Sequence, residues 1–234
     1  MMTATAQDTH EAAKLVAAHR AADLIEDGMI VGLGSGSTAT LFIKLLGERV
    51  AQGLHLRGIA SSIASENLAR SLKIPIVDFE ACPVIDLTVD GADEVAPGLA
   101  LIKGGGGALL REKIVASASK KFMIVADRSK LVARLGHFPL PVEVIPMAAP
   151  LVRRKLEALG LTPTLRHHPD GKICFTDNSN LLLDCASGDE LIRDPERLAA
   201  SIRAMVGVVE HGLFLGMADV ALIADEDGVE EHTA

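Results

Sequence analysis

The segment from residue 89 to residue 113 reads VDGADEVAPGLALIKGGGGALLREK and holds the residue types that a proton transfer requires. Asp90 and Asp93 follow an apolar run. Lys103 precedes four consecutive glycines, and Glu112 lies near the start of an expected helix. A carboxylate can accept and return a proton, and a cation can stabilise a developing oxyanion. We therefore expect a proton-transfer site in this segment.

Glu112 is the carboxylate of the segment that we expect to act as the base. Its angular neighbours on a helix are small and mostly apolar, among them Ala108 and Val115. A carboxylate that is partly removed from water has a raised pKa, which suits a base working near neutrality. The alternative is a surface glutamate that pairs with Arg111 or Lys113.

The glycine run at 104–107 is the second unusual feature of the segment. Each glycine costs about 0.5–1 kcal/mol of conformational entropy relative to alanine in a regular element. Such a loop is more readily tolerated where a ligand must approach the backbone, either a phosphate or the reacting part of a substrate. For Asp90 and Asp93 the alternative is an ordinary turn rich in Asp and Gly, without a chemical role.

A second candidate site is the loop GLGSGSTA at residues 32–39. It is not a dinucleotide fingerprint, because Ser37 stands where the third glycine is needed, and it lacks the lysine of a P-loop. Free N–H groups at a helix N-terminus still favour an anion. We expect phosphate there, with an ordinary strand–helix turn as the alternative. Ser61, Ser62 and Ser65 form another hydroxyl cluster, either for a ligand or for N-capping.

Composition excludes several classes of protein. The net charge of −8 argues against a nucleic-acid partner, and the absence of Trp and Tyr argues against a base-stacking surface. No apolar run approaches the roughly 18 residues of a membrane span, and the charged N-terminus is unlike a signal peptide. Three separated cysteines indicate a reduced, cytoplasmic protein without disulfides or a zinc site.

Basic residues are concentrated between Lys103 and Arg134, a segment that contains eight basic residues and only two acidic ones. This local excess suits a small anion such as a phosphate ester. A solvated helix face is the alternative.

The elements that must position these residues are strands and helices in alternation. Apolar runs separated by helices predict a parallel sheet that is covered on both faces. Asp90 and Asp93 then lie at the carboxyl edge, where open α/β sheets place their ligands. The expected strands span 29–33, 56–60, 74–77, 84–89 and 122–126, with helices through residue 25, over 38–50 and after Ser61.

The pattern changes after Gly136. A strand–helix–strand–strand–helix–strand order predicts a small split βαβ domain, and 219–224 is expected to return to the first sheet. We therefore expect one domain from residues 1–136 plus 215–234 and a smaller one from 137–214. The expected strands of the smaller domain span 138–145, 164–166, 173–177, 181–184 and 208–214, and its helices 150–159 and 195–205.

Eight motifs, in this order and spacing, together resemble those of type A ribose-5-phosphate isomerases along nearly the whole chain. They are GSGSTA (34–39), SSIAS (61–65), DGADE (90–94), KGGGGALLREK (103–113), ADRSK (126–130), FPLPVEVIP (138–146), TDNSNLLLD (176–184) and ADVALI (218–223).

The resemblance implies the reversible conversion of D-ribose 5-phosphate to D-ribulose 5-phosphate, in the non-oxidative branch of the pentose phosphate pathway, without a metal or an organic cofactor. By similarity, Glu112 matches the base that moves a proton between C2 and C1 through a cis-enediolate. Lys103 matches the lysine that stabilises the oxyanion. Asp90 and Asp93 match the aspartates that bind the sugar and assist ring opening.

Further substrate-binding positions follow from the resemblance. The glycine run is then interpreted as backbone beneath the reacting carbons, with the phosphate held by the first loop. Ser35 and Leu110 stand where the family more usually has threonine. Both differences leave the proposed chemical groups intact, and the resemblance makes no prediction of their effect on substrate affinity. The expected binding residues are Ser35, Gly36, Ser37, Thr38, Lys130 and Lys14 on the phosphate side, and Gly91, Ala92, Gly104, Gly105 and Gly106 near the sugar.

At the level of the whole protein, the resemblance implies a Rossmann-like α/β domain with a second, smaller ferredoxin-like α+β domain. Homodimers or homotetramers are expected, acting on a small sugar phosphate without nucleic acid or membrane. The alternative function is a non-catalytic sugar-phosphate-sensing module. Such regulators carry a DNA-binding domain, whereas only about 28 residues precede the first expected strand, and Glu112 and Lys103 would be superfluous in a sensor.

Overall fold

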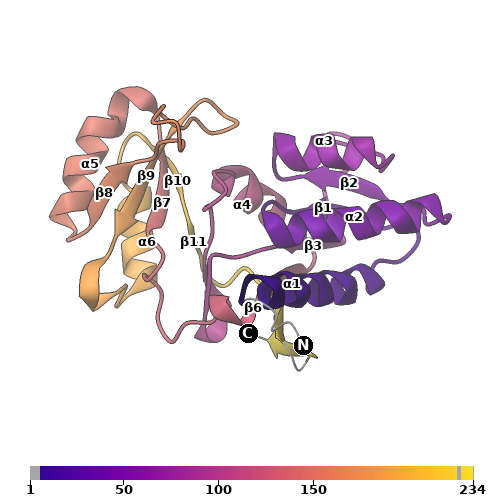
Figure 1. Cartoon of the computed structure of the whole chain (residues 1–234). Helices are drawn as coiled ribbons and strands as arrows, with labels where there is room; N and C mark the ends of the chain where they lie inside the picture. Colours follow the sequence, from indigo (N-terminus) through magenta and orange to yellow (C-terminus); the bar gives the residue numbers. More distant parts are fainter. Residues whose placement is uncertain (1–5, 226–227, 234) are drawn as a thin grey trace. The chain divides into compact units, whose positions relative to one another are not determined.

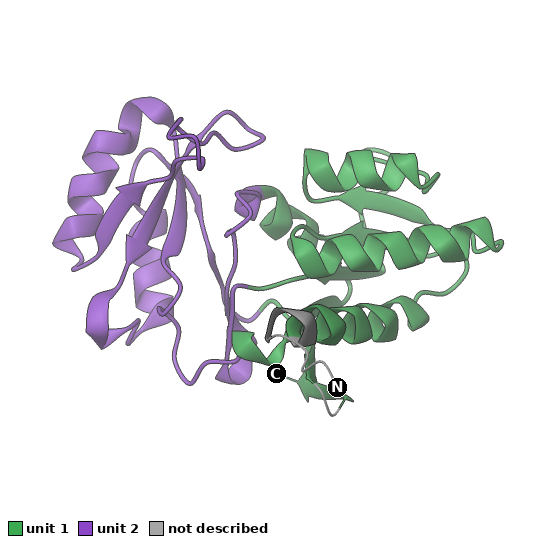
Figure 2. Ribbon diagram, in the orientation of Figure 1, with its two compact units in different colours: residues 1–92, 111–130, 217–234 green, residues 93–110, 131–216 purple. Residues whose placement is uncertain are grey.

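The computed structural model describes residues 6–225 and 228–233. The chain divides into two compact units, shown in Figure 2. Unit 1 comprises residues 1–92, 111–130 and 217–234, and unit 2 comprises 93–110 and 131–216. The packing thus places 93–110 and 131–136 with the second unit. The domain boundaries at 136 and 215 stay a prediction.

Unit 1 is built on a six-stranded sheet in the order β13-β12-β6-β3-β1-β2. Five strands are parallel, and β13 pairs antiparallel with β12. The strand order reverses between β1 and β3, which makes the carboxyl ends of these two strands the switch point where such sheets bind ligands. The strands are β1 (Ile30–Leu33), β2 (Arg57–Ala60), β3 (Leu87–Asp90), β6 (Phe122–Asp127), β12 (Val220–Asp225) and β13 (Gly228–Thr233).

Helices cover both faces of this sheet (Figure 1). One face packs against α1 (Ala6–Asp23), α2 (Ser37–Ala51) and α3 (Ile63–Ser71), where Phe42 and Leu46 are fully buried at helical spacing. The other face packs against α4 (Leu109–Ser117). These observations confirm the predicted Rossmann-like α/β architecture. Within the described residues, every helix is too short or too polar to span a lipid bilayer.

Unit 2 contains an antiparallel sheet in the order β10-β7-β9-β8. Its β-α-β-β-α-β chain order confirms the ferredoxin-like fold. One face packs on its two helices, with Val142 against Val152 and Ile202 in a common core. Residues alternate along a strand, so Glu143 and Asp184 belong to the other face. The elements are β7 (Leu140–Val144), α5 (Ala149–Ala158), β8 (Thr162–Leu165), β9 (Leu181–Ala186), α6 (Pro195–Arg203) and β10 (Val208–His211).

Unit 2 also holds a small three-stranded sheet that the sequence analysis did not predict. It consists of β4 (Glu94–Ala96), β5 (Ala100–Ile102) and β11 (Leu213–Phe214), with β5 in the centre. Strands of two or three residues are too short to show the alternation of apolar and polar residues on which strand prediction depends.

Three predicted strands need correction, and one strand was missed. The segment 74–77 makes only a single bridge, from Ile76 to Gly58, since Pro75 has no N–H to donate to a ladder. The segment 173–177 likewise makes only isolated bridges. The expected strand 208–214 is two strands, because the chain leaves β7 after His211 and pairs with β5 instead. Strand β13 was missed because its sequence, GVEEHT, is mostly polar.

Candidate functional site

Asp90 lies at the switch point of unit 1 and is fixed by the loop that follows β1. The Ser35 and Gly91 N–H groups each donate to Asp90 Oδ1 at 2.8 Å. The side chain is 1% exposed. A Cβ on Gly34 would lie 2.3 Å from the same oxygen, so only glycine allows this approach. The first loop and Asp90, 55 residues apart in sequence, therefore form one structure.

The serines at the start of α3 support this loop. Ser62 is the N-cap of α3 and accepts a hydrogen bond from the Ser65 N–H at 3.1 Å, which confirms the capping interpretation. Ser65 Oγ donates to the Gly34 carbonyl at 2.6 Å, and Ser61 Oγ lies 2.9 Å from Ser35 Oγ. All three serines are buried. Their hydroxyl groups thus hold the first loop in place.

The first turn of α2 provides the N–H groups expected to bind an anion. Gly36 is the N-cap and brings no side-chain cap to these groups. Ser37 is exposed and Thr38 is buried. Unsatisfied N–H groups at a helix N-terminus attract negative charge. Phosphate binding at this turn stays a prediction.

The lysines expected on the phosphate side both belong to unit 1 and are half-buried. Lys130 ends the 3₁₀ turn that follows β6, the strand beside β3. Lys14 lies one turn after His10 in α1, and His10 Nδ1 is 3.2 Å from Asp127 Oδ1 at the end of β6. Burial works against the charge of Asp127, but hydrogen bonds from Ser129 outweigh it and hold the pKa of Asp127 below its ordinary value.

Glu112 lies in the first turn of α4 and is 4% exposed. The alternative of a surface glutamate is therefore wrong. Ala108 and Val115, its expected neighbours on the helix, are also buried. Helices that connect parallel strands begin at the carboxyl edge of the sheet, so the topology of unit 1 places Glu112 at the same edge as Asp90.

In unit 2, Lys103 and Asp93 lie at one end of the β4–β5 hairpin. Glu94 pairs with Ile102, so Asp93 and Lys103 are the next residues on the two strands. The Asp93 N–H donates to the Ile102 carbonyl at 2.8 Å. Lys103 is 2% exposed, and its Nζ lies 5.5 Å from the centre of the Phe214 ring, within range of a cation–π interaction.

Asp93 also holds the glycine run. Its Oδ2 accepts a hydrogen bond from the Gly105 N–H at 2.7 Å. A Cβ on Gly105 would lie 2.5 Å from Asp93 Oδ1, so the close approach requires glycine. Asp93 is thus more than a residue of a local turn, because it fixes a loop twelve residues further along the chain.

Sequence reasoning missed two polar groups on the face of the four-stranded sheet that does not pack on the helices. Arg166 donates to the Gly104 and Gly105 carbonyls and pairs with Asp184. Glu143 is fully buried and accepts hydrogen bonds from Thr176, Asn178 and Asn180. The motif TDNSNLLLD was the available signal, since it supplies Asp184 and all three donors to Glu143.

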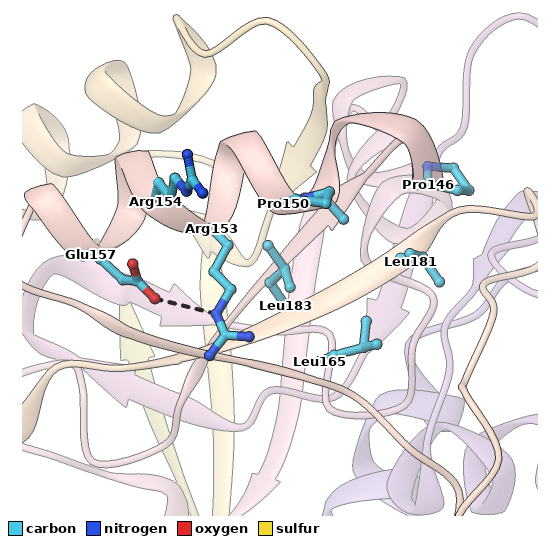
Figure 3. Close-up of a pocket in the computed structure, with 9 residues that line it drawn as sticks. Pro146, Pro150, Arg153, Arg154, Glu157, Leu165, Leu181 and Leu183 are labelled. Atoms are coloured by element: carbon cyan, nitrogen blue, oxygen red, sulfur yellow. Dashed lines mark hydrogen bonds and ion pairs between the residues drawn. The ribbon is translucent and has the colours of Figure 1, made fainter.

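An apolar pocket of about 480 Å³ lies elsewhere in unit 2, between α5 and the sheet (Figure 3). Leu165, Leu181 and Leu183 line it, and the ion pair between Arg153 and Glu157 (3.2 Å) lies beside them. No residue of the predicted site is among its lining residues. The pocket therefore does not mark the expected chemistry.

The predicted site residues fall into two groups, one in each unit. Unit 1 carries Asp90, Gly91, Ala92 and Glu112 with the first loop and both lysines, and unit 2 carries Asp93, Lys103 and the glycine run. In the part of the chain that the structure describes, no three His, Cys, Asp or Glu side chains lie together so as to hold a metal ion.

Comparisons with known proteins point to one family. The sequence pattern of a family described as ribose 5-phosphate isomerase A (phosphoriboisomerase A) matches residues 57–228. A protein of Sphingopyxis alaskensis named ribose-5-phosphate isomerase A is 52% identical over 219 residues, 94% of this chain and 95% of that protein. The solved ribose 5-phosphate isomerase A of Methanocaldococcus jannaschii is 39% identical, with a TM-score of 0.91 over 96% of this chain and 99% of that one. A D-ribose-5-phosphate isomerase solved in complex with phospho-erythronic acid is 37% identical, with a TM-score of 0.92 and the same coverage.

Proposed function

This chain belongs to the ribose 5-phosphate isomerase A family, and from that premise we propose that it interconverts D-ribose 5-phosphate and D-ribulose 5-phosphate. The proposed reaction belongs to the non-oxidative branch of the pentose phosphate pathway. It uses neither a metal nor an organic cofactor. We also place the reaction in the cytoplasm.

The proposed chemistry is the movement of one proton between adjacent carbons. Glu112 takes the proton from C2 of the open-chain aldose, and the electron pair moves to the C1 oxygen to give a cis-enediolate. The same carboxyl group returns the proton to C1. The C2 hydroxyl loses its proton and the C1 oxygen gains one, so that C2 becomes the ketone and C1 carries the hydroxyl group. The ammonium group of Lys103 stabilises the negative charge on oxygen during both steps.

The other residues bind and orient the sugar phosphate. Asp90 and Asp93 assist ring opening and hold the open chain, whose hydroxyl groups also contact the backbone of Gly91, Ala92 and Gly104–Gly106. The phosphate is bound through N–H groups and positive charge by Ser35–Thr38, which lead into the first turn of α2, and by Lys130 and Lys14.

One observation carries the proposal: two opposite charges required by this chemistry are buried. Lys103 is 2% exposed and Glu112 is 4% exposed. Removing an ionised group from water costs several kcal/mol, so buried charges are expected where they are paired or where function requires them. A base and a cation within ten residues of one another in the sequence, both withdrawn from water, fit the isomerase chemistry.

The test is the substitution Glu112→Gln, which keeps the size of the side chain and removes the base. We expect kcat to fall by about 100- to 10,000-fold, the usual contribution of a general base. Binding of phospho-erythronic acid, the compound held by the solved relative, is expected to stay within threefold of wild type. Turnover is measured in a coupled assay with ribose 5-phosphate.

The matched control is Glu157→Gln, which changes an exposed glutamate of α5 and is expected to leave kcat unchanged. Near wild-type turnover of Glu112→Gln would contradict the assignment of the base. A sensing module would bind ribose 5-phosphate without turnover, so wild-type protein that binds but does not convert the sugar would overturn the isomerase proposal itself.

A homodimer or homotetramer is the remaining part of the proposal. Support comes from apolar side chains exposed around the start of α5: Met147 is 83% exposed and Leu151 is 63% exposed. Val206 is 86% exposed and lies on a neighbouring segment, since the Ile145 N–H donates to the Gly207 carbonyl. Exposed apolar groups that lie together mark surfaces for association.

A further inference from the structure

Arg166 in unit 2 connects the four-stranded sheet to the glycine run. It follows β8, and its Nη1 donates to the carbonyl of Gly104 at 3.0 Å and to the carbonyl of Gly105 at 3.1 Å. The opposite edge of the guanidinium binds Asp184 of β9, with Nε donating to Oδ2 at 2.8 Å and Nη2 to Oδ1. One side chain thus joins two consecutive loop carbonyls to the sheet.

The guanidinium of Arg166 is held rigidly. Its backbone is anchored on both sides, because the Arg166 N–H donates to Leu182 and its carbonyl accepts from the Cys174 N–H. The side chain is 14% exposed, and a bidentate pair with a carboxylate fixes the plane of the guanidinium. Burial works against its charge, but the hydrogen bond and the charge of Asp184 outweigh it and raise the pKa of Arg166 above its ordinary value. Arg166 therefore stays charged throughout the working pH range.

The direction of the loop carbonyls determines the direction of the loop N–H groups. In a trans peptide the C=O and the following N–H point in opposite directions. The Gly104 carbonyl accepts from Arg166, and the Gly105 N–H donates the other way, to Asp93. By the same geometry, the Gly105 carbonyl directs the Gly106 N–H away from Arg166. Gly106 is exposed, and a Cβ there would meet no atom within 4 Å.

We propose that Arg166, held by Asp184, is a positioning residue that sets the orientation of the glycine loop, so that the Gly106 N–H faces the reacting end of the sugar phosphate. The proposal rests on the isomerase function proposed above. Arg166 does not touch the substrate in this scheme. It acts by preventing rotation of the Gly104 and Gly105 peptides, a freedom that the glycine run would otherwise have.

Loss of Arg166 is expected to slow the chemical step more than it weakens the binding of phosphate. A backbone donor displaced by about 1 Å lowers rates by as much as 100-fold, whereas the phosphate is assigned to the first loop of unit 1. For Arg166→Met we expect kcat to fall by about 10- to 100-fold. Competitive inhibition by inorganic phosphate is expected to stay within twofold of wild type. For Asp184→Asn, which keeps Arg166 but loosens it, we expect a smaller fall of about 3- to 10-fold.

The experiment compares kcat, KM and the inhibition constant of inorganic phosphate in the full-length variants, with folding followed by circular dichroism. The matched control is Arg203→Met, because Arg203 also pairs with a carboxylate of unit 2, Glu210, but its side chain is 64% exposed. As a second measurement, guanidinium ions at low millimolar concentration are added to Arg166→Ala. We expect them to restore kcat in a saturable manner, and to leave Arg203→Ala unchanged.

Three results would overturn the proposal while leaving the isomerase function intact. The first is a folded Arg166→Met variant with kcat within threefold of wild type. The second is an equal loss of kcat and of phosphate affinity, which would indicate a purely structural role. The third, decisive if Arg166→Met does not fold, is unchanged kcat in Asp184→Asn. Absence of turnover in the wild-type protein would instead refute the proposed function.

Discussion

Individual residues in this protein are withdrawn from water in ways that their types alone would not suggest. Asp90, Lys103 and Glu112 are each at most 4% exposed. Removing a charge from water costs free energy, and contacts with surrounding groups offset part of this cost. Two backbone N–H groups do so for Asp90, and the aromatic ring of Phe214 does so for Lys103. Carboxylates outside the predicted site show the same dependence on backbone donors.

Asp86 provides a pH-dependent test of such a contact. The Ile30 N–H donates to Asp86 Oδ2 at 2.8 Å, and Lys120 Nζ donates to Oδ1 at 2.8 Å. Both hydrogen bonds lower the pKa of Asp86, and the one from the Ile30 N–H has the larger effect. A carboxyl whose folded pKa is depressed stabilises the protein above its unfolded pKa of roughly 4, and this contribution is lost as pH falls through the folded value. We expect Asp86→Asn to be less stable than wild type at pH 7.

The measurement for Asp86 is urea unfolding between pH 7 and pH 3. The difference in free energy of unfolding between wild type and Asp86→Asn is expected to be constant down to about pH 5 and to shrink below about pH 4. A difference that grows on acidification would contradict the sign of the assigned pKa shift.

At the level of elements, the parallel strands of unit 1 bring loops together that the sequence keeps far apart. The carboxyl ends of β1, β2 and β3 meet at one edge, which joins Gly34–Thr38 to Ser61–Ser65 and to Asp90. The start of α3 contributes its own N-cap and hydrogen bonds that support the first loop. Its N-cap therefore affects the stability of the loop that is expected to bind phosphate.

The α3 cap is tested by Ser62→Ala. Loss of the hydrogen bond from the Ser65 N–H is expected to cost about 1 kcal/mol of the free energy of unfolding, the usual value for an N-cap serine. Ser71→Ala, at the exposed end of the same helix, is the control and is expected to change stability by less than about 0.5 kcal/mol. Denaturant unfolding at pH 7 measures both. Equal effects of the two substitutions would mean that the cap does not contribute.

At the level of the whole molecule, the segment that carries the expected chemistry is divided between two units. The chain leaves unit 1 after Ala92 and returns at Arg111. Asp90 and Glu112 consequently belong to one unit, and Asp93, Lys103 and the glycine run belong to the other. Residues that are neighbours in the sequence are thus held by two separate cores, each with its own packing.

Self-association is the prediction that belongs to this scale. Size-exclusion chromatography with light scattering is expected to give about 49 or 98 kDa, two or four times the 24.6 kDa of the chain. Met147→Lys and Leu151→Glu are expected to lower this mass, because a charge on an apolar contact opposes association. Val84→Lys changes an exposed apolar residue of unit 1 and is the control. A wild-type monomer at all concentrations would contradict the predicted oligomer.

The fold class was predictable because long, regular elements leave a strong pattern. The apolar strands of unit 1 and the β-α-β-β-α-β order of unit 2 follow from the spacing of apolar residues and turns. Both were confirmed, apart from the expected strand 74–77. Strands β4, β5 and β13 were not predictable, since they are too short or too polar to show a periodic pattern, and β11 was expected only as the end of a longer strand. Their pairing depends on partners that are distant in the sequence.

The sequence by itself determined which residue types are available for chemistry, because a carboxylate, a lysine or a run of glycines has its properties wherever it lies. It thus pointed to Asp90, Asp93, Lys103 and Glu112. Only the tertiary structure decided the surroundings of these groups: which are buried, which loop Asp90 and Asp93 hold, and that Arg166 binds the glycine run. The physical reason is that burial and hydrogen bonding depend on residues tens of positions apart, and such contacts cannot be predicted from the spacing of neighbouring residues.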